Sequence, residues 1–256
     1  MKQLLLAVDE VARRAGAVAL QHFRQAIEVE VKSDRSPVTV ADRAAEAAAR
    51  ALIEEKFPRD GIVGEEHGTV RPDARRRWII DPIDGTRSFV RGVPLWGTLI
   101  AVAEGNEVLA GCMGFPATDE WIAAARGEGA WYNGGRCRVS DLAEMERAAV
   151  LTTDERFPMA PEWRAPWREL SARVELSRTW GDCYGYLLVA TGRAELMIDP
   201  VLADWDSASL MPIIEEAGGV FTDVRGRRTA FGGSALATNA ALAKQLRVAL
   251  GVGAVA

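Results

Sequence analysis

The segment Trp78-Ile79-Ile80-Asp81-Pro82-Ile83-Asp84-Gly85-Thr86 constrains the fold and the chemistry of this chain more than any other stretch. The run from Arg77 to Ile80 predicts a buried strand, and Asp-Pro followed by Asp-Gly predicts a turn at its end. Two carboxylates at a strand end can converge with a backbone carbonyl on one hard cation, because Mg²⁺ prefers oxygen ligands. If a helix opens near Thr86, its free N–H groups would face a phosphate held by that metal. The alternative is that Asp81 and Asp84 only form the turn or cap a helix.

Two other acidic segments strengthen the interpretation of a metal site. Ile62-Val63-Gly64-Glu65-Glu66-His67-Gly68 is an apolar strand that ends in a glycine-flanked acidic pair. Trp205-Asp206-Ser207-Ala208 leads into Met211-Pro212-Ile213-Ile214-Glu215-Glu216-Ala217-Gly218-Gly219. In this order and at this spacing, the three segments resemble the inositol monophosphatase family, and the resemblance covers most of the chain.

The chain divides into two parts of different character. Residues 1–140 combine two helices with a run of strands, which predicts an α+β half carrying most of the metal ligands. Strands and helices alternate over residues 141–256, which predicts an α/β half carrying the substrate pocket and the last metal ligand. The resemblance implies an α/β protein with a layered α-β-α-β-α sandwich and an active site between the halves.

Apolar periodicity and turn residues predict the individual elements. Helices are expected over 3–26, from the N-cap Thr39 to about Phe57, and over 162–172, 183–191, 205–217 and 239–250. Strands are expected over 29–31, 61–64, 77–81, 96–104, 107–115, 120–126, 136–139, 148–152, 174–178, 194–198, 219–222 and 235–238. We expect a turn at 33–37, a solvated loop at Arg75–Arg77, and a variable loop at 153–166.

Composition and missing motifs argue against several classes of protein. The net charge of −5 argues against a nucleic-acid partner, and no run approaches the roughly 18 apolar residues of a membrane span. The three widely spaced cysteines predict free thiols in a reducing cytoplasm. No phosphate-binding loop of the Walker type is present. With only His22 and His67 available, base catalysis is expected from carboxylates or metal-activated water.

The resemblance assigns roles to the residues at matching positions. It implies that two or three Mg²⁺ ions are bound by Glu65, Asp81, the carbonyl of Ile83, Asp84 and Asp206. Glu65 and Thr86 would orient the attacking water, with Asp84 also in a catalytic role. The N–H groups of Gly85 and Thr86 would hold the phosphate, and Lys32 and Asp42 would lie near the metals. The alternative for Asp206 is a surface or capping role.

The implied mechanism follows from charge. A phosphate monoester dianion repels a nucleophile, so Mg²⁺ would offset that charge and ionise a water molecule placed for in-line attack. A second ion would stabilise the leaving alkoxide. No covalent phosphoenzyme is required.

The second half contains the residues expected to select the substrate. The segment from Arg178 through Trp180, Asp182 and Tyr184, followed by Asp199-Pro200, is similar to the histidinol-phosphate phosphatase branch of the family. Arg91-Gly92-Val93-Pro94-Leu95-Trp96 fits that branch too. Histidinol phosphate carries an ammonium and an imidazole, which the two acids would attract and the aromatic rings would contact. The alternative for Asp182 is a cap on the following helix.

Three functions are therefore compared. The first is hydrolysis of L-histidinol phosphate, a step of histidine biosynthesis, by a Mg²⁺-dependent phosphomonoesterase. The second is the same chemistry on another small substrate, such as inositol 1-phosphate or a nucleotide 3′-phosphate. The third is a non-catalytic regulator that binds metal and phosphate, against which the complete set of acidic residues and Thr86 argues. The family resemblance also implies a homodimer.

Overall fold

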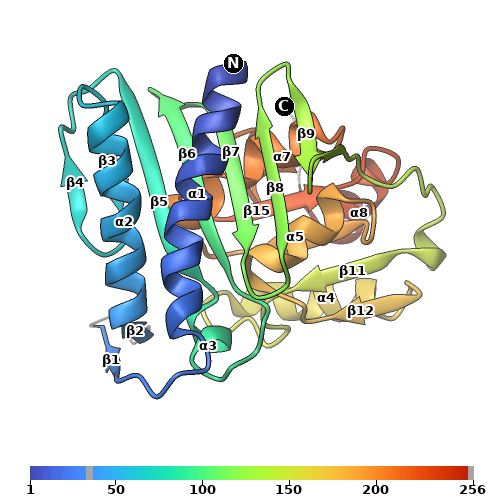
Figure 1. The fold of residues 1–256 in the computed structure, drawn as a ribbon. Coiled ribbons are helices and arrows are strands. Elements are labelled where there is room, and N and C mark those ends of the chain that lie inside the picture. The colour runs from blue at the N-terminus through green and yellow to red at the C-terminus, as the bar shows by residue number, and fades with distance from the viewer. Residues whose placement is uncertain (33–36, 253–256) are drawn as a thin grey trace.

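Two sheets of unequal size organise the computed structural model, which describes residues 1–32 and 37–252. Of the turn expected at 33–37, residues 33–36 lie outside the described part, and Pro37 opens a strand. In the large sheet the strands follow the order β10 (Gly135–Arg136), β9 (Gly129–Tyr132), β8 (Glu120–Ala125), β7 (Glu107–Phe115), β6 (Gly97–Glu104), β5 (Arg76–Asp84), β3 (Gly61–Gly64) and β4 (Gly68–Val70). All neighbours are antiparallel except β3 and β5 (Figure 1).

The small sheet belongs to the second half of the chain. Its order is β12 (Leu176–Arg178), β11 (Ala149–Thr152), β13 (Leu196–Asp199), β15 (Ala235–Thr238) and β14 (Val220–Thr222). The first three strands are parallel, and β15 is antiparallel to both of its neighbours. A separate hairpin pairs β1 (Val29–Val31) with β2 (Pro37–Thr39).

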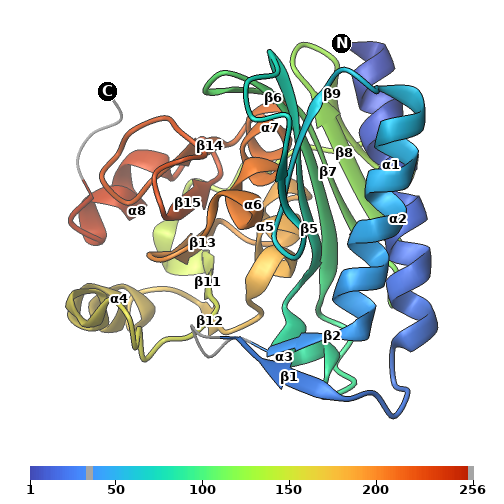
Figure 2. The ribbon, with the colours of Figure 1, turned by 90° about the vertical axis from the view of Figure 1, so that its left-hand side faces the viewer.

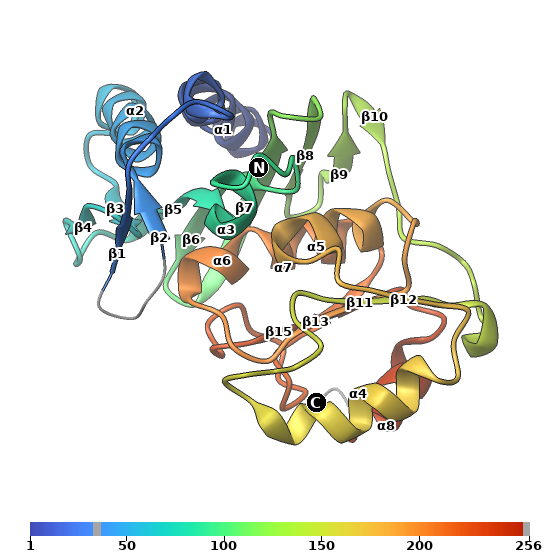
Figure 3. The same ribbon diagram turned by 90° about the horizontal axis from the view of Figure 1, so that it is seen from below.

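Helices complete five layers. The helices are α1 (Lys2–His22), α2 (Val40–Lys56), α3 (Thr86–Phe89), α4 (Arg164–Ser171), α5 (Asp182–Ala190), α6 (Asp204–Ala208), α7 (Leu210–Glu216) and α8 (Ala243–Ala249), with short 3₁₀ turns at Met145–Arg147 and Pro161–Trp163. Helices α1 and α2 cover the outer face of the large sheet, α5, α6 and α7 lie between the sheets, and α4 and α8 cover the small sheet (Figures 2 and 3). The expected α-β-α-β-α sandwich is confirmed.

Three apolar clusters fill the spaces between the layers. One lies between α1, α2 and the large sheet, one between the two sheets, and one between the small sheet and α4 and α8. The middle cluster joins residues of both halves, such as Leu99 of β6 with Leu187 of α5 and Ile213 of α7. Because each fully buried side chain of this kind contributes about 1.5–3 kcal/mol, this cluster holds the two halves in one arrangement. The division at 140/141 stays a prediction.

Several boundaries differ from the sequence-based expectation. The strand expected at 77–81 extends over 76–84, so Arg76 and Arg77 lie in β5 and the loop predicted for them is wrong. The helix expected over 205–217 is divided at Ser209 into α6 and α7. The reason is Pro212, which has no N–H to donate to the carbonyl one turn earlier. The strand expected at 136–139 is replaced by β9 and β10, and the strands β2 and β4 were not predicted.

Within residues 1–32 and 37–252, no helix combines the length and the apolar character needed to cross a membrane.

Candidate active site

Asp81, Asp84 and Asp206 form the central acidic cluster. One carboxylate oxygen from each lies within 4.8 Å of the others, and this is the cluster with metal-ligand geometry found among the described residues. Asp81 and Asp84 lie at the end of β5, and Asp206 lies in the first turn of α6. The structure therefore brings together three carboxylates that were predicted from segments more than a hundred residues apart.

A bulge in β5 explains how Asp81 and Asp84 face one point. In a regular strand, residues three apart point to opposite faces of the sheet. The pairing of β5 with β6 shifts register between Asp81 and Asp84, so the extra residue turns both carboxylates to the same side. The N–H of Ile83 donates to Asp81 Oδ1 at 3.1 Å, and Thr98 Oγ1 donates to the carbonyl of Pro82 at 2.8 Å. The bulge is thus fixed by hydrogen bonds on both sides.

The three carboxylates of this cluster lie close together and are largely buried, so their negative charges repel one another. Burial raises the pKa of Asp81 and of Asp84 well above the ordinary value, and the nearby carboxylates raise it further. Burial also raises the pKa of Asp206, which shares a hydrogen bond with Asp81. Crowded acids of this kind favour the ionised form only when a cation offsets their charge. Because all the donors are oxygens, the site fits a hard divalent cation such as Mg²⁺.

Glu65 lies beside the cluster and is held by Lys32. Lys32 Nζ donates to Glu65 Oε1 at 2.7 Å and to Glu66 Oε1 at 2.6 Å. Burial raises the pKa of Glu65 to about 7, although the Lys32 ammonium opposes the shift, and the charges of Glu66 and Asp206 add to it. Burial alone would lower the pKa of Lys32, but its two carboxylate partners raise it. A carboxylate that titrates near neutral pH is suited to accept a proton.

Thr86 and Asp42 form the next part of the site. Thr86 Oγ1 lies 3.0 Å from the carbonyl oxygen of Ile83 and 3.5 Å from Asp42 Oδ1. Asp42 is buried because it completes the expected capping box of α2, in which Asp42 Oδ2 accepts the N–H of Thr39 at 2.8 Å. The helix expected near Thr86 is present as α3, with Gly85 as its left-handed N-cap at φ 82°. Glycine adopts this left-handed conformation without the steric cost of a Cβ atom.

A cavity of about 370 Å³ adjoins the acidic cluster and contains both predicted substrate acids. Its polar lining includes Asp84, Arg87, Thr153, Asp182, Asp199 and Asp206. Burial raises the pKa of Asp199 to about 7 and that of Asp182 to about 6, while the Arg87 guanidinium opposes the shift at Asp182. Two acids in one cavity that are hard to ionise favour a cationic ligand.

The capping role considered for Asp182 is not what the geometry shows. Helix α5 begins at Asp182 itself, its N-cap is Gly181, and none of the side chains that the structure describes caps it. Asp182 has a left-handed backbone with φ 51°, and its N–H donates to Thr153 Oγ1 at 2.8 Å. The next N–H, that of Cys183, donates to Asp84 Oδ2 at 2.5 Å. The start of α5 therefore contacts the predicted metal ligand Asp84 and the cavity residue Thr153 from adjacent positions.

Three predicted substrate residues do not line this cavity. The Tyr184 hydroxyl donates to Glu120 Oε2 at 3.0 Å, and its ring packs edge-on against Phe115. Arg178 is exposed at the end of β12, where it bonds the carbonyl of Ser177. Trp180 is 41% exposed in the segment before α5. Their roles in substrate binding remain predictions without support from the cavity.

Other residues in the site were not predicted, although the sequence contained a signal for each. Thr153 follows β11, and ligands of open α/β sheets bind beyond the carboxyl ends of parallel strands. Tyr186 lies one turn after Asp182 on α5, and its hydroxyl donates to Asp199 Oδ2 at 3.1 Å. Arg87 directly follows Thr86 and lines the cavity.

Glu46, one turn after Asp42 on α2, was also missed. It is completely buried, and its carboxylate accepts the N–H of Glu66 at 2.7 Å and that of His67 at 3.1 Å. These bonds fix the turn that carries Glu65. His67 itself contacts the carbonyl of Arg43 through Nε2, in an exposed position.

The comparisons with known proteins agree with this geometry. Residues 1–251 match the inositol monophosphatase family. The histidinol-phosphatase of Chlorobaculum parvum is 44% identical over 246 residues, which cover 95% of this chain and 95% of the relative. The histidinol-phosphatase of Mycobacterium tuberculosis is 37% identical and covers 96% of this chain and 94% of its own. The solved structure of an inositol monophosphatase from Zymomonas mobilis has a TM-score of 0.87 at 31% identity and covers 98% of each chain.

A sandwich fold with an oxygen-rich acidic site beside a polar cavity defines the chain as a phosphoric monoester hydrolase. The chain belongs to the inositol monophosphatase family, whose members generally depend on metal and act on small phosphate monoesters.

Proposed function

We propose that the protein hydrolyses L-histidinol phosphate to L-histidinol and phosphate with the help of Mg²⁺. The observation that carries the proposal is a single cavity whose lining contains the predicted metal ligands Asp84 and Asp206 together with the predicted substrate acids Asp182 and Asp199. Phosphate would bind beside the metal ligands, and the ammonium group of the leaving alcohol would lie between the second pair of acids. Two relatives described as histidinol-phosphatases support this choice of substrate.

The residues proposed to hold two or three Mg²⁺ ions are Glu65, Asp81, Asp84, Asp206 and the carbonyl of Ile83. When bound, Mg²⁺ would supply positive charge that offsets the phosphate and acidifies water. In the structure, the Ile83 carbonyl already accepts a hydrogen bond from Thr86 Oγ1, which leaves one lone pair available.

The protein's own residues would orient the water and move its proton. We propose that Glu65, with a pKa of about 7, accepts the proton of the attacking water. Thr86, which contacts Ile83 and Asp42, would fix the direction of attack through its hydroxyl. The N–H groups of Gly85 and Thr86, at the start of α3, would donate to the phosphate.

Substrate selection would depend on charge. Burial keeps Asp182 and Asp199 from ionising readily in the free protein, and an ammonium between them would restore their ionised form. Charge-assisted hydrogen bonds are worth about 1.5–3 kcal/mol each, or about ten- to a hundredfold in affinity. A neutral polyol would gain less affinity from Asp182 and Asp199, because its hydrogen bonds to them lack the charge of an ammonium group.

Hydrolysis of inositol 1-phosphate is the second candidate, because a relative from Rhizobium meliloti described as an inositol-1-monophosphatase is 32% identical. The deciding experiment is phosphate release from a panel of esters with Mg²⁺ present: histidinol phosphate, inositol 1-phosphate and a nucleoside 3′-phosphate. We expect histidinol phosphate to have a kcat/KM at least about tenfold above the others. A higher value for inositol 1-phosphate would overturn the assigned substrate, and no release from any ester would overturn catalysis.

We also propose a homodimer in the cytoplasm. The family resemblance supports the dimer, and the free thiols of Cys112, Cys137 and Cys183 support a reducing compartment. Light scattering of the purified protein tests the first proposal.

A further inference from the structure

A second and smaller cavity adjoins the substrate end of the active site. It has a volume of about 150 Å³ and shares Thr153, Asp199 and Val201 with the larger cavity. The rest of its wall comes mainly from Phe157–Ala160 and Pro200. We call this cavity the annex. Asp199 therefore stands between the space where the phosphate would bind and a more apolar space beyond it.

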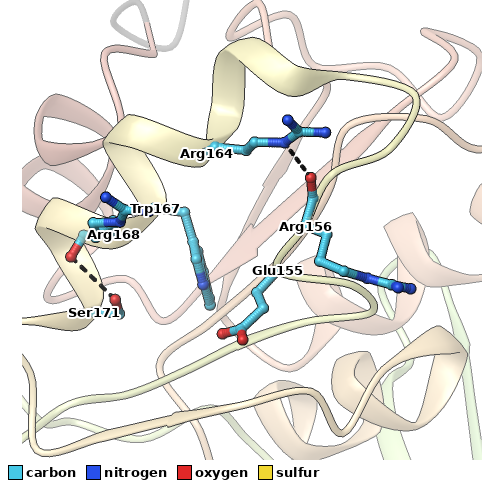
Figure 4. Close-up of a pocket in the computed structure, with 6 residues that line it drawn as sticks. All are labelled: Glu155, Arg156, Arg164, Trp167, Arg168 and Ser171. Carbon is cyan, nitrogen blue, oxygen red and sulfur yellow. Dashed lines mark hydrogen bonds between the residues drawn. The ribbon is translucent and has the colours of Figure 1, made fainter.

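The segment Phe157–Ala160 of the annex wall is held in place by contacts with α4. Phe157 is buried with a left-handed backbone at φ 42°, and its ring packs edge-on against Trp167 of α4 at 6.0 Å. The guanidinium of Arg164 donates to the carbonyl of Arg156, and both residues line a separate cavity of about 540 Å³ together with Trp167 (Figure 4). A non-glycine residue with positive φ persists only where its surroundings hold it, and such residues gather at functional sites.

The annex also contains a polar group without a partner. Thr152, in its lining, is completely buried, and its hydroxyl makes no hydrogen bond within the described part of the chain. An unsatisfied buried hydroxyl is destabilising, so most buried polar groups have a partner. A ligand that carries a polar ring atom into the annex would provide one.

We propose that the annex binds a small, flat heteroaromatic ring at the far end of the leaving alcohol. This inference rests on the proposed function and deepens it. A cavity of about 150 Å³ is large enough for a benzene molecule, and an imidazole ring is smaller. The larger cavity contains the metal ligands and the acid pair in its lining, and the annex adjoins it at Asp199. Histidinol phosphate has three groups that would occupy these places: phosphate beside the metal ligands, the ammonium-bearing carbon beside the acid pair, and the ring in the annex.

The annex also separates this substrate from a polyol. The hydroxyl groups of an inositol ring would reach Asp182 and Asp199 directly, but such a substrate has no group to place beyond them. The annex would therefore select for the ring, and the acid pair would select for the charge. These two contributions can be measured separately.

The test compares two substrates that differ only in the ring. Alaninol phosphate keeps the phosphate and the ammonium-bearing carbon of histidinol phosphate but has a hydrogen in place of the imidazole. With wild-type protein and Mg²⁺, we expect kcat/KM for histidinol phosphate to exceed that for alaninol phosphate by at least about tenfold. Equal values would mean that the ring gains nothing from the annex.

Ala160→Leu fills the annex from its wall, and Ala165→Leu makes the same change at an exposed position of α4. We expect Ala160→Leu to lower kcat/KM for histidinol phosphate about tenfold or more and to change that for alaninol phosphate less than about twofold. Ala165→Leu should change neither. Two results for Ala160→Leu would contradict ring binding in the annex: an equal loss of kcat/KM on both substrates, or no loss on either substrate with the fold intact.

Thr152→Val provides a second test if Ala160→Leu does not fold. Valine has nearly the same shape and removes the unpaired hydroxyl, so the melting temperature should stay the same or rise. We expect a loss of about tenfold for histidinol phosphate alone. The wild type could prefer histidinol phosphate while neither variant changes the ratio of kcat/KM between histidinol phosphate and alaninol phosphate. That result would overturn the annex proposal and leave the proposed function standing. If the wild type does not hydrolyse histidinol phosphate, the proposed function fails with it.

Discussion

At the scale of single residues, we expect the crowded carboxylates of the acidic cluster to destabilise the metal-free protein, because the charges that are needed to bind the metal repel one another without it. The Asp84→Asn variant should lose at least about a hundredfold in kcat, because an amide keeps the shape but not the charge. The melting temperature of the same variant in excess chelator should rise by a few degrees. One carboxylate fewer reduces the repulsion, and the asparagine oxygen can still accept the N–H of Cys183.

Asp73→Asn, in an exposed turn, is the matched control and should change neither quantity. Near wild-type turnover by Asp84→Asn would show that Asp84 does not hold the metal. A fall in melting temperature without metal would show that the carboxylate is stabilising in the free protein.

Asp199 gives the metal-free protein a characteristic dependence on pH. Its pKa is about 7 in the folded protein and 3.8 for an ordinary aspartate. Between about pH 4 and pH 7 the folded state therefore retains a proton that the unfolded state has released. Stability from this group is complete below about pH 4 and is lost as the pH rises toward 7.

Asp199→Asn should remove this contribution, since the amide oxygen can still accept the N–H of Thr153 and the amide NH2 can donate to the Tyr186 hydroxyl oxygen. We expect the melting temperature of chelator-treated wild type to fall more steeply from pH 5 to pH 7 than that of the variant. The difference should reach at least about 5 °C. Parallel curves for the two proteins would contradict a raised pKa at this residue.

At the scale of elements, the turn after β3 depends on one glycine. A Cβ at Gly64 would overlap the buried carboxylate of Glu46, which fixes the N–H groups of Glu66 and His67. Gly64→Ala should therefore displace Glu65. We expect the melting temperature to fall by at least about 3 °C, since overpacking costs about 1–3 kcal/mol, and kcat to fall with it.

Gly135→Ala is the matched control, because its added Cβ would meet its nearest atom at 3.7 Å, an ordinary contact distance. This variant should retain both kcat and melting temperature. Wild-type kcat in Gly64→Ala would mean that the position of Glu65 does not depend on the Glu46 contact.

The elements that sequence predicted best are those whose determinants are local. Helix α2 begins where Thr39 and Asp42 predict it, because a capping box involves neighbouring residues only. The bulge in β5 could not be predicted, because it depends on the register with β6. The loop predicted at 153–166 is irregular over residues 153–160, but the sequence could not show that this segment forms the wall of a cavity, because that depends on contacts with α4 and β13.

The same distinction holds for the site. The metal ligands could be found because each lies in a short motif with its own turn residues. The substrate residues depend on how α5 is rotated, which sequence does not specify. Tyr186, and not Tyr184, faces Asp199, because the helix turns Tyr184 toward Glu120.

At the scale of the whole molecule, a bound metal would join parts of the chain that are far apart in sequence. Asp81 and Asp84 come from the large sheet, and Asp206 comes from the layer between the sheets. An ion that binds only the folded state stabilises it by about 2.7 kcal/mol at a hundred times its dissociation constant. We expect Mg²⁺ to raise the melting temperature by at least about 5 °C and excess chelator to abolish activity.

Asp206→Asn should remove the effect of Mg²⁺ on melting while leaving the metal-free protein folded. The Asp73→Asn control should keep the full effect. Undiminished turnover in excess chelator would rule out a metal-dependent mechanism, and an unchanged Mg²⁺ shift in Asp206→Asn would remove Asp206 from the ligand set.

The backbone at Asp182 restricts how proteins of this kind can diverge. A residue at φ 51° is tolerated as aspartate, asparagine or glycine, and most other side chains are strained there. Few single substitutions at position 182 can therefore change the substrate preference: aspartate keeps the charge, asparagine removes the charge, and glycine removes the side chain. The adjacent N–H of Cys183 is bonded to Asp84, so larger rearrangements would also disturb the metal ligands. Substrate range should change more easily through the segment 157–160, which forms part of the annex wall.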